Sequence, residues 1–428
     1  MLLSFRFANH RSFRDEQQLN LVPVYEADHP QEFSALPVTA VFGANASGKS
    51  NAISALAYLC HMVTSSDRYS EPDRGVDRAP YRLDPEIAAE PSRYVADLLL
   101  DGVRHTYGFT VDDDQILEEW LYSYPLKRRR IVFERAGQDY RWGEGAQQTP
   151  LVQLSGITAP NVLFLTIAAR ARQELVVPVY NWFLRDVMVS YQHGLPKGRS
   201  LAAYVDRLDD PPRRKVIVDL VRAADVGIED VSLSRPPEPQ HEQPDLEYLS
   251  GKLAQGHRLP YEPRLLFSHA GARGNVLLEW HEQSAGTRQL FDLALKAEQA
   301  LHRGSLLLVD EIDSSLHPVL TASLIRLFQN PEVNQRAGQL VLTTHDATLL
   351  GSLQGGEVLR RDQIWFAEKG DDGASTLFPL SDFHPRKQEN RQRRYLNGSY
   401  GAIPEISDEL FVKALTSRGE VGGIEEGA

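Results

Sequence analysis

The sequence predicts an α/β fold in which a sheet carries a phosphate-binding loop, together with an antiparallel β lobe and a helical insertion. Three observations lead to this fold class. Residues 43–50 read GANASGKS, a glycine-rich loop closed by lysine and serine. The apolar run 306–309 ends in two acids, Asp310 and Glu311. Between these segments, residues 93–134 are rich in strand-forming residues and are divided by turn signals such as Asp-Gly.

The N-terminal segments supply the strand, loop and helix order that a phosphate-binding loop requires. Residues 2–7 alternate like a half-buried strand, and a short strand near 18–22 is expected to pair with them. Residues 37–42 are apolar and of strand type, and Ile53 and Leu56 recur at helical spacing after the loop. The loop should therefore present backbone N–H groups and a helix N-terminus to phosphate oxygens.

The loop predicts a nucleotide site with Mg²⁺. Lys49 is expected to reach the terminal phosphates and Ser50 to hold the metal. Because the loop recognises phosphates and not the base, these residues alone leave ATP and GTP both open. The residues expected to bind the nucleotide here are Gly43, Asn45, Ser47, Gly48, Lys49, Ser50 and Asn51.

The acid pair after the second apolar run completes the predicted chemistry. Charges at the end of a buried strand are costly unless a cation or hydrogen-bond donors compensate them. Asp310 is therefore expected to hold Mg²⁺, directly or through water, and Glu311 to orient and deprotonate the attacking water. Alone, the pair would indicate only an acidic turn, and the phosphate loop changes that interpretation.

Two further segments flank the acid pair. Ser284, Gly286 and Thr287 open a helical pattern, with Ser284 suited to the N-cap and small residues that let an anion approach. By itself this sequence would indicate only a helix cap. The strand-like run 340–344 ends at His345, which is a candidate sensor of the γ-phosphate.

Taken in order, these motifs resemble the ABC-type ATPase head in its RecF/SMC branch. Residues 9–13, Asn-His-Arg-Ser-Phe, are similar to the Asn-Phe-Arg-Ser turn of that branch, which implies that Arg11 lies close to bound ATP. His10 replaces the usual phenylalanine. The Ser-Ala-Gly-Thr signature differs from the Leu-Ser-Gly-Gly-Gln of transporters. The glutamine-loop residue stays open, with Gln115 and Gln153 as possibilities.

Within that branch, the chain is most similar to compact bacterial AAA ATPases that include RloA-like and abortive-infection phage-resistance proteins. Residues 42–51, 310–318 and 394–404 carry this likeness. The resemblance implies an ATP-gated homodimer, in which the signature of one subunit caps the γ-phosphate held by the other, because a lone phosphate loop leaves one side of that phosphate facing water. Assembly beyond a dimer stays open.

Composition limits the class of protein and the surroundings in which it works. The chain has 428 residues, 42% of them hydrophobic, and a net charge of −12, so it is not a polycation that coats nucleic acid. Any DNA or RNA contact must be local, at 127–130, 213–215 or 386–394, and each run is read first as a solvated face. The single cysteine, Cys60, is expected to pack in the core. We expect a cytoplasmic protein, since no signal peptide or long apolar run is seen.

Four segments describe the expected organisation of the chain. Residues 1–150 would hold the phosphate loop and the β lobe, and 151–245 a helical insertion ending in a proline-rich loop. Residues 246–380 would hold the signature, the acid strand and His345, and 381–428 the tail.

Three functional classes follow from these expectations. The first is the sensor ATPase of an anti-phage defence system working with a separate effector such as a nuclease, since only 83 residues follow His345, too few for a fused Toprim nuclease. The alternative is a RecF/SMC-like DNA repair or recombination ATPase that binds DNA directly. The third, a transporter subunit, is disfavoured by the signature and the long insertion, and no membrane partner is expected.

Overall fold

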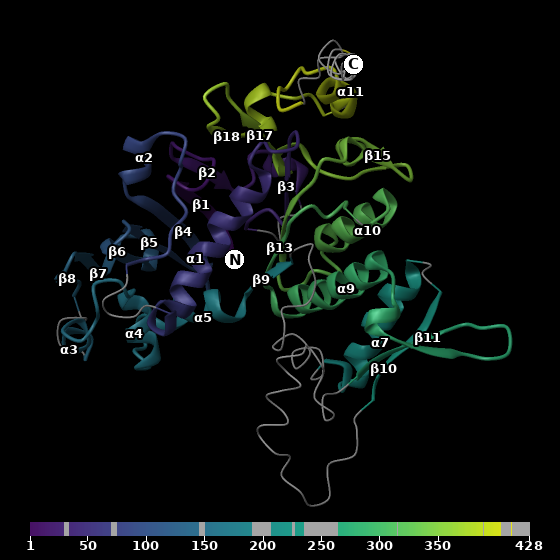
Figure 1. Ribbon diagram of the computed structural model, residues 1–428, viewed down its shortest axis with the longest axis horizontal. Helices are drawn as coiled ribbons and strands as arrows, with labels where there is room; N and C mark the ends of the chain where they lie inside the picture. Colours follow the sequence, from purple (N-terminus) through teal and green to yellow (C-terminus); the bar gives the residue numbers. More distant parts are fainter. Residues whose placement is uncertain are drawn as a thin grey trace, which may run out of the picture.

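Two large sheets enclose a central helix in this protein. The computed structural model describes residues 1–29, 34–69, 75–144, 150–190, 207–224, 227–234, 264–314, 316–387, 389–403 and 412. Helix α1 (Lys49–Tyr69) follows the phosphate loop and lies between the antiparallel lobe on one side and the core sheet on the other (Figure 1). The fold class predicted from the sequence is confirmed.

The core sheet has six strands and is buried on both faces. Five of its strands are parallel, and β18 pairs antiparallel with β17 at one edge. Val41 and Leu308 face the cluster that contains α1, whereas Phe42 and Leu307 face the opposite cluster. Such two-sided burial explains the continuous apolar runs. The strand order is β18 (Ser375–Pro379), β17 (Ile364–Lys369), β3 (Val38–Phe42), β14 (Gln339–Thr343), β13 (Leu306–Val309), β9 (Val187–Ser190).

Helices cover both faces of the core sheet. On one face α1 packs with α4 (Phe164–Arg170) and α5 (Val177–Arg185), and on the other lie α9 (Ala285–Arg303) and α10 (Pro318–Gln329). Cys60 is buried on α1, and burial raises the pKa of its thiol to about 12, as expected for a packing residue. None of the helices described here is both long and apolar enough to cross a membrane.

The antiparallel lobe is a seven-stranded sheet in which the hairpins within residues 92–136 are the ones predicted, whereas the strand at 139–142 was not predicted. The turn between β4 and β5 holds Asp101 at φ 47° and Gly102 at φ 76°, the left-handed pair of a two-residue hairpin. The N-terminal strands β1 and β2 pair as expected and also extend this sheet. Its order is β2 (Gln17–Asn20), β1 (Leu2–Ala8), β4 (Ser92–Leu100), β5 (Val103–Val111), β6 (Ile116–Tyr124), β7 (Arg130–Ala136), β8 (Asp139–Trp142). Short helices α2 (Pro85–Ala89) and α3 (Leu151–Ser155) lie at its borders.

The segment predicted as a helical insertion is not helical throughout. It contributes β9, a strand of the core sheet that pairs parallel with β13. Helix α7 (Pro211–Ala223) lies in this segment and buries Ile217, Val218 and Val221, whereas Val216 is 48% exposed. The proline-rich loop expected at 236–245 lies outside the described residues. The segment boundaries at 150, 245 and 380 stay predictions.

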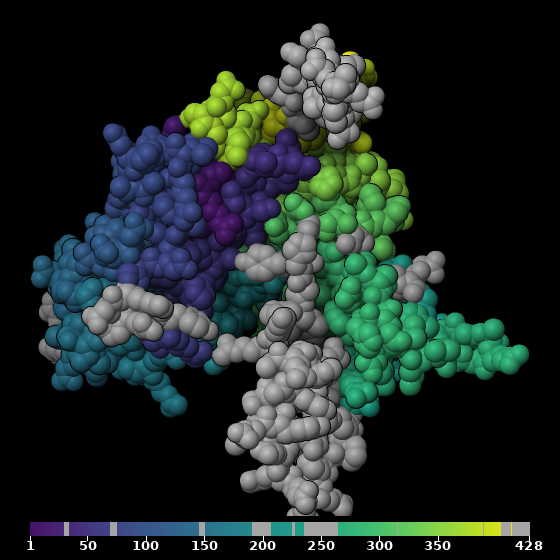
Figure 2. Space-filling view, viewed as in Figure 1, coloured from purple at the N-terminus to yellow at the C-terminus, as the bar shows by residue number. Residues whose placement is uncertain are grey.

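A small three-stranded sheet packs beside α7 and α9. Its strands run β10, β11, β12, and the first two share a core with both helices. The β11–β12 hairpin projects from the body of the molecule (Figure 2). Its bounds are β10 (Ile228–Ser234), β11 (Arg264–His269) and β12 (Val276–Glu279), and a ribbon of β15 (Ser352–Leu353) and β16 (Gly356–Glu357) lies near α10.

The tail motif packs against the core sheet. Helix α11 (Arg391–Leu396) carries Tyr395, whose ring stacks on Phe366 of β17 at 5.4 Å, and Tyr400 stacks on the same ring at 5.6 Å. The backbone N–H of Ala402 donates to Glu368 at 2.8 Å. Residues 394–403 therefore complete the core next to β3, while residue 404 lies outside the described residues.

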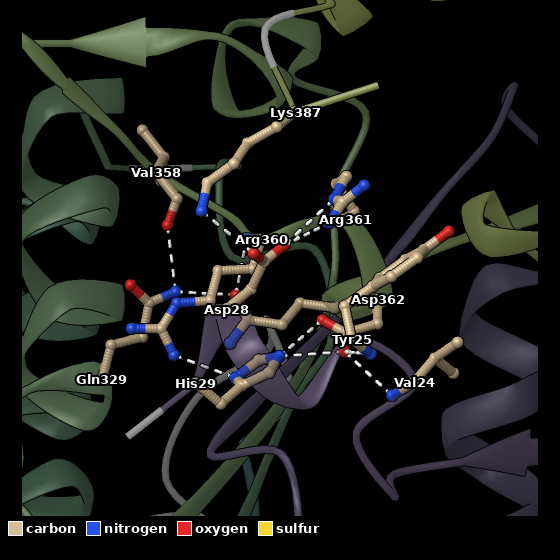
Figure 3. Close-up of polar contacts among 11 residues, drawn as sticks. Val24, Tyr25, Asp28, His29, Gln329, Val358, Arg360, Arg361, Asp362 and Lys387 are labelled. Carbon is tan, nitrogen blue, oxygen red and sulfur yellow. Dashed lines mark hydrogen bonds and ion pairs between the residues drawn. The ribbon is translucent and has the colours of Figure 1, made fainter. Parts of the chain in front are cut away.

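A buried polar cluster fixes the segment between β2 and β3 at the amino ends of the parallel strands (Figure 3). The Nε2 of His29 lies 2.7 Å from Asp362, and Arg360 lies 2.9 Å from the other ring nitrogen. Asp362 also accepts two backbone N–H bonds from residues 24 and 25. Asp28 binds Arg361 and Lys387. These contacts hold the chain on its way into β3.

Candidate functional site

Three adjacent parallel strands bring the predicted motifs to one edge of the core sheet. The phosphate loop follows β3, His345 follows β14 and the acid pair follows β13, with β14 in the middle. Thr343 is in register with Val41, and Val309 with Leu342. Since neighbouring strands lie about 4.8 Å apart, the ends of β3 and β13 are separated by about 10 Å. Lys49 and Asp310, 261 residues apart in sequence, are thus neighbours in space.

The phosphate loop needs its glycines. Gly48 has φ 109°, and a Cβ there would lie 2.6 Å from the hydroxyl oxygen of Ser375. A Cβ at Gly43 would lie 2.3 Å from the carbonyl oxygen of Ala367 on β17. The loop therefore runs so close to β17 and β18 that side chains at these two positions would collide with them.

The Lys49 ammonium is buried and bound by its own loop. Nζ donates to the carbonyl oxygens of Gly43 and Ala44, each at 2.8 Å. Burial lowers the pKa of Lys49, and the nearby carboxylates of Glu311, Asp313 and Asp310, in that order of strength, act to raise it. The three carboxylates therefore lie close enough to the loop to act on the charge of Lys49.

Thr343, which the sequence analysis did not single out, joins the two acids. Its hydroxyl donates to Asp310 at 2.7 Å and accepts the backbone N–H of Glu311 at 2.7 Å. Glu311 has φ 48°, a left-handed backbone that a non-glycine residue adopts only when its surroundings impose it. The fully buried Thr343 therefore sets the conformation at which the second acid leaves the strand.

Asp313 positions His345 by contacts to both its ring and its backbone. The carboxylate lies 3.0 Å from Nδ1 of the histidine and accepts the backbone N–H of His345 at 3.3 Å. The Asp313 side chain is 5% exposed and the His345 side chain 56%, so a buried acid holds a ring that faces outward. Asp313 belongs to a motif that the sequence analysis quoted, but no role was inferred for it.

A polar group on the opposite side of the loop was also missed. The Ser12 hydroxyl accepts from Asn51 at 2.8 Å and pairs with the Ser375 hydroxyl at 2.8 Å. Ser375 in turn lies against Gly48. The turn between β1 and β2 therefore reaches the phosphate loop through Ser12, and Asn51 has a structural contact there in addition to its predicted ligand role.

Arg11 and His10 are adjacent in sequence but lie in different surroundings. With Ser54 and Tyr58 it lines a depression of about 800 Å³ along the flank of α1. His10 is buried between the Tyr94 hydroxyl at 2.8 Å and the Ser54 hydroxyl at 2.9 Å. The predicted role of Arg11 at the nucleotide stays a prediction.

Among the described residues, no hydrogen bond joins either candidate for the glutamine loop to the phosphate loop. The backbone N–H of Gln115 donates to Asp112 at 2.7 Å in the turn before β6. Gln153 is exposed on α3.

The signature forms the helix start that was predicted. Ser284 caps α9, and its hydroxyl accepts the backbone N–H of Thr287 at 3.0 Å. Ser284 is exposed and Gly286 half-exposed. Gln289, one turn on, donates to Ser314 at 3.4 Å, which brings this end of α9 beside the segment after the acids. In the part of the chain that is described, no hydrogen bond joins residues 284–287 to the phosphate loop.

Several features of the loop fit a triphosphate with Mg²⁺. The Ser47 hydroxyl is buried and has no hydrogen-bond partner among the described residues. Asn45 is exposed at the loop tip, and Ser50 is half-buried at the second position of α1. The described residues contain no group of three or more metal-binding side chains. Mg²⁺ held by one carboxylate, one hydroxyl and phosphate oxygens needs no such group.

A known protein family matches most of this chain. Residues 38–351 match the family described as "AAA domain, putative AbiEii toxin, Type IV TA system". No curated protein matches the chain. A solved structure that is similar is an Smc head domain from Pyrococcus furiosus with an extended coiled coil, bound to the C-terminal domain of ScpA. Its TM-score is 0.42 at 13% sequence identity, covering 90% of this chain and 98% of that one. Since the family match spans more than half of the sequence, the chain belongs to this AAA-domain family.

Proposed function

We propose that the chain binds ATP with Mg²⁺ at residues 43–51 and hydrolyses it. The observation that supports this most directly is the meeting of the phosphate loop, the acid pair and His345 at the carboxyl ends of β3, β13 and β14. Ligands of open α/β sheets bind at this edge. Ser50 and Asp310 would hold Mg²⁺, which neutralises phosphate charge when bound.

Glu311 is the proposed general base. Its backbone is fixed by Thr343, next to the proposed metal ligand Asp310, so its carboxylate can take a proton from water near the terminal phosphate. Lys49 would exchange the two loop carbonyls for phosphate oxygens, a replacement that compensates its buried charge. His345, held by Asp313, would donate to the γ-phosphate.

The proposed working form is an ATP-bridged homodimer. The start of α9 is exposed and capped, and it makes no hydrogen bond to its own phosphate loop within the described residues. It would instead present N–H groups to the γ-phosphate on a second copy, with Ser284, Gly286 and Thr287 as contacts. Loss of that phosphate would open the contact and convert nucleotide state into a change of assembly.

Two substitutions test the ATPase assignment. Glu311→Gln should retain ATP binding, lower turnover at least about a hundredfold and accumulate a dimer, followed by light scattering with and without ATP. Lys49→Ala should abolish measurable ATP binding by calorimetry. Native turnover in the first variant would remove the general-base role, and native affinity in the second would refute the loop assignment.

For the cellular role, we propose the regulatory ATPase of an anti-phage defence system that acts with a separate effector. The family description, which names a type IV toxin–antitoxin system, supports this class over a DNA repair ATPase. Cells carrying the gene with its neighbours should resist phage, and Glu311→Gln should remove that resistance. Unchanged plaque counts, together with hydrolysis stimulated by duplex DNA in a steeply salt-dependent way, would favour the repair alternative.

A further inference from the structure

The antiparallel lobe has an open depression on the face turned away from α1. Tyr94, Tyr107 and Leu121 point toward the core, so alternation places their chain neighbours on the outer face. The depression there has a volume of about 660 Å³ and draws its lining from strands β1, β4, β5, β6, β7 and β8. None of its side chains belongs to the proposed ATP site.

Arginine and aromatic side chains alternate across this outer face. Arg93 lies over the ring of Trp120 at 5.1 Å, Arg104 over Tyr124 at 5.1 Å and, from the adjoining turn, Arg129 over Tyr122 at 3.8 Å. The three aromatic residues occupy alternate positions of β6, so they form a row. A planar guanidinium held flat on a ring is itself a stacking surface for a base.

The sheet beneath this row leaves room for a flat aromatic ring. Gly108 of β5 lies opposite Trp120, and a Cβ at this glycine would come within 2.5 Å of the indole. The glycine therefore lets the indole lie against the sheet. Burial of Trp120 to 9% exposure shows that the platform is packed in place.

The turn between β6 and β7 adds a cationic rim to the depression. It carries four consecutive basic residues, 127–130, and all four are exposed. Leu126 is 96% exposed at the same turn, and it and Lys127 have φ of 54° and 61°. Two successive left-handed non-glycine residues are costly, and a leucine held out in water has no role in packing.

The charge on this face is opposite to that of the whole chain. The outer lining has five arginines, Arg6, Arg93, Arg104, Arg129 and Arg141, and the turn adds Lys127, Arg128 and Arg130. Four carboxylates, those of Asp97, Glu118, Glu134 and Asp139, oppose these eight cations. Asp97 pairs with Arg6 and Arg104, and Glu134 pairs with Arg129 and Arg141, so the excess positive charge lies mainly at the turn, while Arg135 pairs with Glu119 below the face. The face is therefore locally positive on a chain of net charge −12.

We propose that this face, which we name the arginine–aromatic platform, binds single-stranded nucleic acid. Phosphates would contact the cationic rim, and unpaired bases would stack on Tyr122, Tyr124 and the arginine side chains that lie over the row. A duplex hides its bases from such a row, so single strands are the favoured form. The other two basic runs lack this character, because most of their cations are ion-paired, among them Arg213 with Asp210 and Lys387 with Asp28.

Anisotropy of labelled oligothymidine and oligouridine of about 16 nucleotides tests the platform and distinguishes DNA from RNA. The variant K127A/R128A/R130A should bind at least about tenfold more weakly, with a log–log salt slope reduced by about 2. Tyr122→Ala should weaken binding about tenfold with the salt slope unchanged, and Tyr122→Phe should retain it. The matched control R213A/R214A/K215A removes the same charge on α7 and should bind normally.

The outcomes separate clearly. Loss in the platform variants with normal control binding and unchanged ATPase activity supports the proposal. Absence of binding at low salt, tighter binding of a duplex, or equal loss in the control overturns it. Binding of poly-glutamate but not of oligonucleotides, with the same dependence on residues 127–130, would replace it with an acidic protein partner. ATP binding is measured separately, so failure here leaves the ATPase assignment untouched.

Discussion

Thr343→Val is the sharpest test of how the acid pair is held. The substitution keeps the shape of the side chain and removes only the hydroxyl, which is fully buried. Two hydrogen bonds of 2.7 Å disappear, one to the Asp310 carboxylate and one from the Glu311 backbone N–H. Bonds to charged groups contribute about 1.5–3 kcal/mol and an unpaired buried N–H costs about 1–3 kcal/mol. Because both acids are half-exposed, water can replace part of the lost hydrogen bonding, and we expect the free energy of unfolding to fall by about 2–3 kcal/mol.

The effect on turnover should be larger than the effect on stability. Without the hydroxyl, Glu311 has no reason to keep φ 48° and should relax toward ordinary backbone angles, which moves its carboxylate. A displacement of about 1 Å at a catalytic group costs about a hundredfold in rate. We therefore expect kcat to fall about a hundredfold while KM changes little, because Lys49 and the loop are untouched.

Steady-state ATPase kinetics and urea unfolding measure the two effects separately. Thr343→Ser retains the hydroxyl and should keep most of the turnover, which makes it the matched control. A folded Thr343→Val protein with native kcat would refute the argument that this hydroxyl positions the acids. Equal losses in the valine and serine variants would show that the methyl group matters as much as the hydroxyl.

Three further predictions concern stability and the loop. Burial, with a smaller contribution from the neighbouring Arg11, lowers the pKa of His10 to about 3, so the fold favours the neutral imidazole. The stability that this preference contributes is complete above pH 6.5 and is lost as the pH falls toward 3. His10→Phe should remove up to about 1.4 kcal/mol per pH unit of this pH dependence, measured as the difference in urea unfolding between pH 7.5 and pH 5. Asp362→Ala breaks the buried cluster of Figure 3 and should lower the free energy of unfolding in urea by about 3–5 kcal/mol. Asp372→Ala breaks an exposed ion pair and should lower it by under about 1 kcal/mol. Similar losses of stability in the two variants would contradict the role of burial. Gly48→Ala should weaken ATP binding about ten- to a hundredfold in calorimetry, and Ser375→Gly should not rescue it, because the φ of 109° remains; full rescue would show that only the contact matters.

Local patterns in the sequence predicted most of the elements near the site. Alternation and turn residues predicted β4 to β7, since a hairpin needs only neighbouring residues. The strand before the phosphate loop and the cap at Ser284 follow from equally local rules. β9 was missed because a four-residue strand with three apolar residues, inside a helical region, carries no distinguishing period.

The sequence by itself determined the chemical groups: a glycine-rich loop, a lysine, two acids and a capped helix start, each readable because its function depends on adjacent residues. Only the tertiary structure decided which distant residues assist them. Thr343 under the acids, Asp313 behind His345, and Ser12 with Ser375 against Gly48 are contacts between segments up to 363 residues apart. Such contacts depend on strand order and register, and a single sequence does not encode these in any local period.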